Sequence, residues 1–179
     1  MATNKMTPQA VGAYGEKMVE AALLRRGWLP SNVNDSVKNA ARFDIVAQGP
    51  EGQLVPIRVK TCRPQLDAFR FGGYDAKQPI PTNDLGSVDF TVFVAMGKDM
   101  VEDQFYVVPT REVRQVLESR RIAYFGRKRK DGQPLSTDVA IKLSLRPMAS
   151  GVDRDGGYDF DRKWKHYRGA WDLLAANSN

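Results

Sequence analysis

The stretch FDIVAQGPEGQLVPIRVKTC, residues Phe43 to Cys62, decides the predicted fold. It reads as two β-strands, about Arg42 to Gln48 and Leu54 to Thr61, joined by the turn GPEGQ. An acid stands near the start of the first strand and a lysine near the end of the second. A hairpin that carries two opposite charges at matching depth raises the question of what these charges do.

The geometry of a strand brings three charged residues of this hairpin together. Side chains alternate between the two faces of a strand, so Arg58 and Lys60 point to the same face. Asp44 can lie near Lys60 across the hairpin if the turn is centred at about Glu51 and Gly52. The pattern is typical of a cross-strand ion pair, and it is equally typical of a catalytic acid and lysine.

The sequence around the hairpin alternates between helical and extended patterns. A helix is expected from Thr7-Pro8 to about Arg26, where Gly27 stops it, with Glu16 at the rim of its apolar face and Glu20 solvated. This order predicts an α/β fold with a mixed central sheet flanked by helices. The other expected elements are a weak strand in WLPSNVND, strands at Phe69–Phe71, Val88–Met96, Gln104–Val108 and Val139–Leu145, a helix opening at Pro109-Thr110, and a closing helix from about Asp161 to Ala176.

The composition limits the kind of protein. With 179 residues and 42% hydrophobic content, the chain is expected to form a single domain over residues 1–179. One cysteine, Cys62, and one histidine, His166, exclude disulfides within the chain and metal centres built on paired cysteines or histidines. No apolar run reaches membrane-spanning length, so a soluble, cytoplasmic protein without a membrane partner is expected. The net charge of +6 favours a polyanionic partner.

The chemistry of the hairpin follows from its residue types. A carboxylate such as Asp44 can hold a hard divalent cation, which prefers oxygen ligands. A lysine beside it, Lys60, can orient or deprotonate a water and stabilise negative charge that develops at phosphorus. Glu16, at the edge of the first helix, could reach the same place.

The segments YGEKMVEAALLRRGW, ARFDIVA and IRVKT together resemble the nuclease core of the PD-(D/E)XK superfamily, which has the restriction-endonuclease-like fold. The later segments VDFTVFVAMG, QFYVVPTREV and YRGAWDLL extend the resemblance over most of the chain. By position, Glu16 matches the helical acid of that family, Asp44 the hairpin aspartate and Lys60 the lysine. The resemblance implies a magnesium- or manganese-dependent DNA endonuclease in which Asp44, the Val59 carbonyl and Glu16 hold the metal.

Arg58 departs from the pattern of the family. It stands where the family has a second acidic or glutamine ligand, and an arginine neither binds a cation nor accepts a proton. Two functions therefore stay open. The first is divalent-metal-dependent phosphodiester hydrolysis with Glu16, Asp44, Arg58 and Lys60 as the catalytic set. The second is a weakened or inactive nuclease fold that serves as a nucleic-acid-binding or assembly factor.

Basic residues outside the hairpin are candidates for contact with DNA, branched and single-stranded forms included. The dense charge run Arg127 to Lys130 is expected to be either a solvated loop tip or an arm that contacts phosphate. The oligomeric state is left open, a homodimer being one option. The candidate nucleic-acid-binding residues are Arg63, Arg70, Lys77, Arg127, Lys128, Arg129 and Lys130.

Overall fold

The computed structural model describes residues 6–33, 43–63, 68–74, 78–80, 89–97, 102–127, 132, 139–145, 160 and 162–176. The chain forms two compact units. The first draws on Met1–Leu66, Val88–Pro109 and Tyr167–Asn179, and the second on Asp67–Ser87 and Thr110–His166. The expectation of a single domain stays a prediction.

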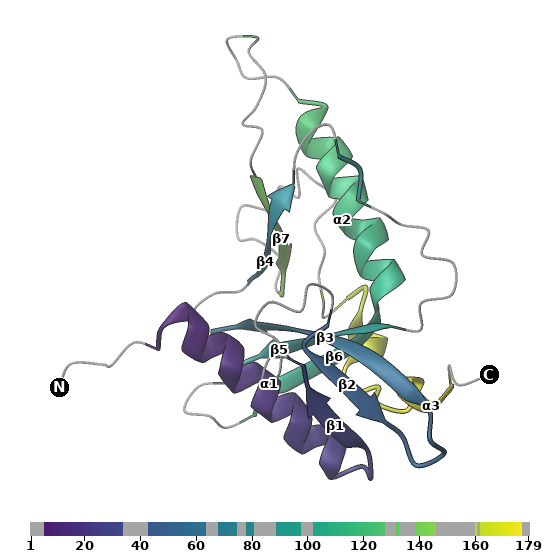
Figure 1. Cartoon of the computed structure of the whole chain (residues 1–179). Coiled ribbons are helices and arrows are strands. Elements are labelled where there is room, and N and C mark those ends of the chain that lie inside the picture. Colours follow the sequence, from purple (N-terminus) through teal and green to yellow (C-terminus); the bar gives the residue numbers. More distant parts are fainter. Residues whose placement is uncertain are drawn as a thin grey trace, which may run out of the picture. The chain divides into compact units, whose positions relative to one another are not determined.

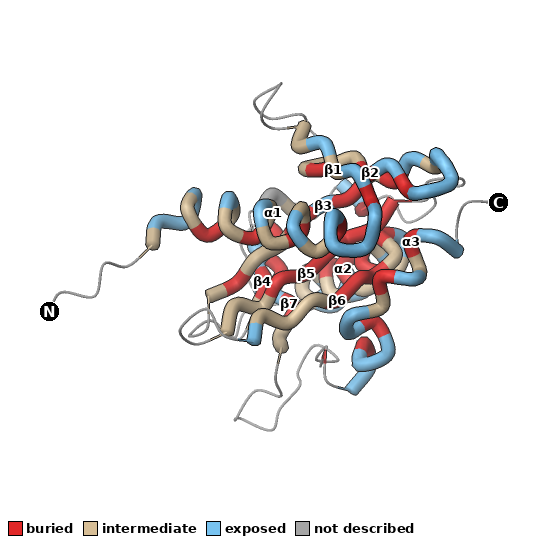
Figure 2. Tube along the Cα trace, turned by 90° about the horizontal axis from the view of Figure 1, so that it is seen from below, coloured by how far each residue is buried: buried red, intermediate tan, exposed pale blue. Residues whose placement is uncertain are grey.

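The first helix, α1 (Pro8–Leu24), begins where the sequence predicts and ends two residues before the expected Arg26. The Thr7 hydroxyl accepts a hydrogen bond from the Ala10 backbone N–H at 3.2 Å, and Pro8 occupies the first helical position. Gly27, with φ of 78°, follows the last turn and adopts a backbone conformation that other residues rarely take. One side of α1 is buried along its length (Figure 2), with Val11, Gly15, Val19 and Leu23 on that side.

Unit 1 is built on a five-stranded sheet with the strand order β1-β2-β3-β5-β6. Strands β3 and β5 are parallel, whereas the other neighbours are antiparallel, so the sheet is mixed. The predicted α/β class with a mixed central sheet is therefore confirmed, and Figure 1 shows α1 lying along this sheet. The strands are β1 (Leu29–Asn32), β2 (Ile45–Gln48), β3 (Leu54–Cys62), β5 (Phe90–Ala95) and β6 (Gln104–Pro109).

The core of unit 1 lies between this sheet and the helices. Strand β3 alternates between buried and more exposed positions, as expected for a strand with one face on a core. Strand β5 is buried at five successive positions, because it lies inside the sheet. The buried cluster comprises Val19, Leu23, Trp28, Ile45, Ala47, Val55, Ile57, Val59, Phe90, Val92, Val94, Val107, Trp171 and Leu174.

Unit 2 contains a two-stranded antiparallel ribbon, β4 (Ala68–Tyr74) and β7 (Val139–Ser144), and the helix α2 (Thr110–Phe125). Figure 1 shows the ribbon beside α2. Aromatic rings consolidate this unit. The Phe160 ring lies 5.3 Å from Phe69 and 4.9 Å from Trp164 between centroids, distances typical of favourable aromatic pairs.

The prediction of one continuous closing helix is wrong. The described segment has a single 3-10 turn at Lys165–Tyr167 and the short helix α3 (Leu173–Ala176). Gly169, with φ of 65°, interrupts the helix, and its N–H donates to the Phe105 carbonyl of β6 at 2.8 Å. The apolar stripe is nevertheless buried, because the chain folds Trp164, Tyr167, Trp171 and Leu174 inward without a regular helix.

None of the helices that the structure describes has both the length and the apolar character needed to cross a bilayer.

Candidate functional site

Strand β3 presents its charged residues on the face opposite the core. Val55, Ile57 and Val59 are buried, whereas Arg58 between them is exposed and Lys60 is partly buried. Arg58 and Lys60 therefore share one face, as the alternation predicted. Two cations two positions apart on a strand lie close enough to act on one ligand.

Asp44 joins these cations through the hairpin register. The last pair of the register joins Ile45 of β2 to Ile57 of β3, and Asp44 lies one residue before it. The Asp44 N–H donates to the Ile57 carbonyl at 2.9 Å, and the Asp44 Oδ2 accepts the Val59 N–H at 2.7 Å. The Asp44 carboxylate therefore continues the hydrogen bonding between the two strands beyond their last paired position.

The electrostatics of the site disfavour charge on the lysine. Burial lowers the pKa of Lys60 below its ordinary value, and the Arg58 guanidinium lowers it further. The Asp44 carboxylate acts in the opposite direction. Both neighbours therefore act on the charge of Lys60, and Arg58 has the larger effect of the two.

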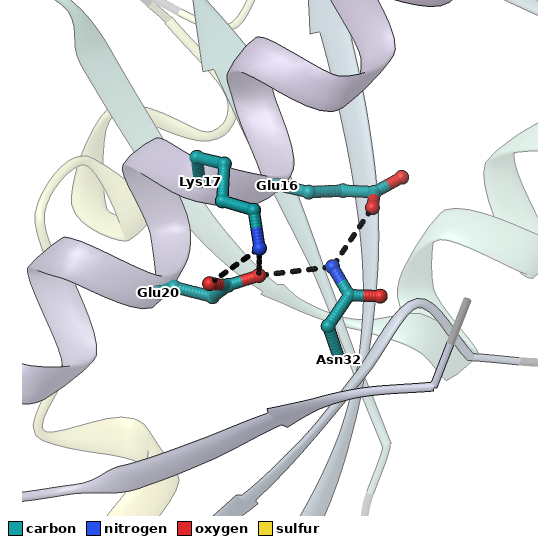
Figure 3. Close-up of polar contacts among 4 residues, drawn as sticks. All are labelled: Glu16, Lys17, Glu20 and Asn32. Atoms are coloured by element: carbon teal, nitrogen blue, oxygen red, sulfur yellow. Dashed lines mark hydrogen bonds and ion pairs between the residues drawn. The ribbon is translucent and has the colours of Figure 1, made fainter. Parts of the chain in front are cut away.

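Glu16 is held on α1 by a neighbour that the sequence did not suggest. The Asn32 side-chain amide, at the end of β1, donates to Glu16 Oε2 at 3.0 Å and to Glu20 Oε1 at 2.9 Å (Figure 3). Lys17 approaches Glu20 at 3.0 Å. The expectation that Glu20 is solvated is wrong, since its side chain is 18% exposed. One amide thus bridges two carboxylates on successive turns of the helix.

Helix α1 lies close against β3 at Gly15. A Cβ atom placed on Gly15 would lie 1.7 Å from Thr61 Oγ1 and 2.9 Å from Thr61 Cβ, so only glycine fits. Among the described residues, the Thr61 hydroxyl has no hydrogen-bond partner. The contact sets the backbone of Glu16 beside the residue that follows Lys60 in the strand.

The described residues do not match the donor set that a magnesium ion prefers. No three Asp, Glu, His or Cys side chains of the described residues lie together in a way that could hold a metal. The Asp44 carboxylate accepts a backbone N–H, and the Arg58 guanidinium acts on Lys60 together with it. Magnesium is held by carboxylate oxygens and water, and neighbouring cations repel it. The predicted ligand set of Asp44, Val59 and Glu16 stays a prediction.

The candidate nucleic-acid-binding residues are in different situations. The Arg63 guanidinium donates to the Met6 carbonyl near the start of α1, so it has a structural role. Arg70 is exposed on β4, and Arg127, just after α2, is partly exposed. Lys77, Lys128, Arg129 and Lys130 lie outside the described residues.

Two polar residues of interest escaped the sequence reasoning. Asn32 lies in a segment read as a weak strand, and only the β1–β2 pairing places it under α1. Lys142 alternates with the buried residues Ile141 and Leu143, which marks it as outward-facing. Its partner across the ribbon, Arg70, depends on a strand register that links residues far apart in the sequence.

No known protein family and no curated protein matches the sequence. Among solved structures, the bacterial homing endonuclease I-Ssp6803I is similar to this chain, with a TM-score of 0.45 and 15% sequence identity. The match covers 97% of this chain and 95% of that one. At this TM-score and identity, the likeness establishes neither family nor activity.

Proposed function

We propose that this protein binds nucleic-acid phosphate through Arg58 and Lys60, and that its nuclease-type hairpin hydrolyses DNA slowly or not at all. The observation that carries the proposal is the charge on β3, where Arg58 and Lys60 share one face and Arg58 affects the pKa of Lys60 more than Asp44 does. Such a set suits an anion better than a divalent cation.

The residues have distinct roles in this proposal. The Arg58 guanidinium offers a planar fork of donors that matches two oxygens of a phosphate, and it is exposed on the strand. Lys60, two positions further along the same face and partly buried, adds a second donor. Asp44 fixes the end of the hairpin through the Val59 N–H and partly balances the charge. Binding therefore needs no metal.

Coulomb's law gives the size of the effect on a metal. Two unit charges 4 Å apart interact by about 4 kcal/mol at an effective dielectric near 20, and a divalent ion beside Arg58 would experience roughly twice that repulsion. About 8 kcal/mol corresponds to several orders of magnitude in affinity. Asp44, as one carboxylate, offsets only part of this repulsion.

A metal-dependent DNA endonuclease is the second candidate. The observation that favours it is the Asp44 carboxylate, which accepts the Val59 N–H and acts on the charge of Lys60. In this candidate, Asp44, the Val59 carbonyl and Glu16 hold magnesium or manganese, and Lys60 positions a water. Glu16 would first have to release the Asn32 amide.

Binding of a labelled DNA duplex in the presence of a chelator separates the two candidates. Under the proposal, the wild type binds without metal, and Arg58→Gln lowers the salt slope of log affinity by about 0.9, the value for one phosphate contact. Arg25→Gln, which removes the same charge from an exposed position at the end of α1, is the matched control and should leave the slope unchanged.

Asp44→Asn has a different expected effect under each candidate function. If Arg58 and Lys60 bind phosphate, removal of the nearby negative charge strengthens binding in the chelator. If the site is a metal-dependent nuclease, added magnesium or manganese produces cut DNA with the wild type, and Asp44→Asn abolishes cutting. Brisk wild-type cleavage with magnesium would refute the proposal.

A further inference from the structure

We propose that the outer face of the β4–β7 ribbon is a second contact surface for duplex DNA, in which Arg70 and Lys142 bind phosphates of the backbone. This inference rests on the proposed function in one respect, namely that the partner is a nucleic acid. It concerns a different unit of the chain and different residues from the hairpin site.

The ribbon has one buried face and one open face. Phe69 and Phe71 of β4 and Ile141 and Leu143 of β7 are at most 6% exposed. Because side chains alternate along a strand, the residues between them must point the other way. Arg70 and Lys142 are the charged residues of that outer face, and both are exposed.

The two cations lie directly opposite each other. The register pairs Arg70 with Lys142, so their side chains leave neighbouring strands at the same level. Like charges at directly opposed positions of an antiparallel pair destabilise it. A third cation adds to them, because Arg120 of α2 donates to the carbonyl of Lys142. A phosphate placed over this pair converts repulsion into attraction.

The neighbours of the pair on the outer face are small. Ala68 and Ser144 flank it on one side, and Gly72 and Ala140 on the other. A Cβ atom added at Gly72 would meet nothing within 4 Å, so no packing reason requires a glycine there. Small side chains around two long cations allow a polyanion to approach the strands closely.

A duplex of DNA is the partner that fits these features. The major groove of B-form DNA admits a two-stranded ribbon, whereas that of an RNA duplex is too narrow for side chains to enter. A pair of cations without carboxylates on the ribbon face suits phosphate, which is contacted most often by arginine and lysine.

The test is the salt dependence of binding of the full chain to a short DNA duplex. Arg70→Ala combined with Lys142→Ala should reduce the salt slope of log affinity by about 1.8, which is twice the value of one contact. If affinity scales in this way from 1 M salt, the loss at 0.1 M is roughly 60-fold. Lys163→Ala with Lys165→Ala removes the same charge from exposed positions and should leave the slope unchanged.

A second variant guards against loss of fold. Arg70→Glu creates an opposite-charge pair with Lys142, so it should raise the melting temperature by roughly 1 to 4 °C while it weakens DNA binding. An unchanged slope in the ribbon double variant, with a wild type that binds DNA, overturns the inference but leaves the proposed function intact. A wild type that binds no DNA overturns both. Equal competition by an RNA duplex of the same sequence refutes the assignment to DNA.

Discussion

Replacement of Gly15 by alanine tests the packing that positions the candidate site. The new Cβ would lie 1.7 Å from Thr61 Oγ1 and 2.9 Å from Thr61 Cβ, against a normal contact of about 3.4 Å or more. Rotation of the threonine can move the hydroxyl but not its Cβ, so helix α1 and strand β3 must separate. Overpacking of this kind costs about 3 kcal/mol at the upper end of its usual range.

The helix itself would gain from the same change, which sets the net value. Alanine is better than glycine in a helix interior by about 1 kcal/mol, so the expected net loss for Gly15→Ala is about 2 kcal/mol. Gly12→Ala, one turn earlier, is the matched control, because a Cβ there would meet nothing within 4 Å. It should gain up to about 1 kcal/mol. The two variants should thus differ by about 3 kcal/mol, or roughly 6 to 12 °C in melting temperature.

Chemical unfolding followed by circular dichroism measures both variants. Combining Gly15→Ala with Thr61→Ala should recover more than about 1 kcal/mol relative to the sum of the single changes, since residues in contact couple by this amount. If Gly15→Ala is as stable as Gly12→Ala, the helix does not approach the strand at Gly15. The position of Glu16 beside β3 would then lose its support.

Three further predictions concern other groups. Asp44→Asn should change the melting temperature by less than about 2 °C, because an amide oxygen can still accept the Val59 N–H. Asp44→Ala should cost about 1 to 3 kcal/mol of stability, because it leaves that N–H unsatisfied. Equal losses in the two variants would contradict the role of Asp44 as acceptor of the Val59 N–H. Glu118→Gln should destabilise unit 2 by about 1 to 3 kcal/mol, because Glu118 accepts hydrogen bonds from Arg121 at 2.6 Å and from the Ile80 N–H at 2.9 Å. These two donors lower the pKa of Glu118, so its stabilising contribution is full above the unfolded-state pKa and is lost as pH falls through the folded-state pKa. A stability difference between variant and wild type that does not change with pH would refute this. Burial and the hydrogen bond to Asp103 raise the pKa of Tyr14 to about 12. The contribution of Tyr14 to the stability of the fold is therefore present below pH about 10 and lost as pH rises toward 12. Ultraviolet titration of the wild type, compared with Tyr14→Phe, should show one phenol of that high pKa.

The hairpin and the first helix could be predicted from sequence because their signals are local. Thr7, Pro8 and Gly27 mark the ends of α1, and the turn between Gln48 and Leu54 fixes the β2–β3 register. The register pairs Ile45 with Ile57, so the turn is centred at Glu51 as expected, and Asp44 acts on the charge of Lys60. Local patterns thus give the elements and the shared face of the charges.

The features that could not be predicted depend on contacts between distant segments. Asn32 reaches Glu16 and Glu20 only because β1 pairs at the edge of the sheet under α1. The closing segment has helical periodicity, yet Gly169 donates to β6 and breaks it. In both cases tertiary contacts override local preference.

The discontinuous make-up of unit 1 has a consequence for the order in which the chain acquires its structure during synthesis. The buried cluster of unit 1 includes Trp171 and Leu174, which are translated after every strand of its sheet. At about 5 to 20 residues per second, the ribosome needs roughly 3 to 13 s to go from Pro109, the end of the last strand of this sheet, to these two residues. During that interval the sheet face that they cover is available to chaperones and to other nascent chains. Premature termination before Trp171 would leave this face permanently exposed, so truncated products should be recovered mainly in aggregates or as targets of proteolysis.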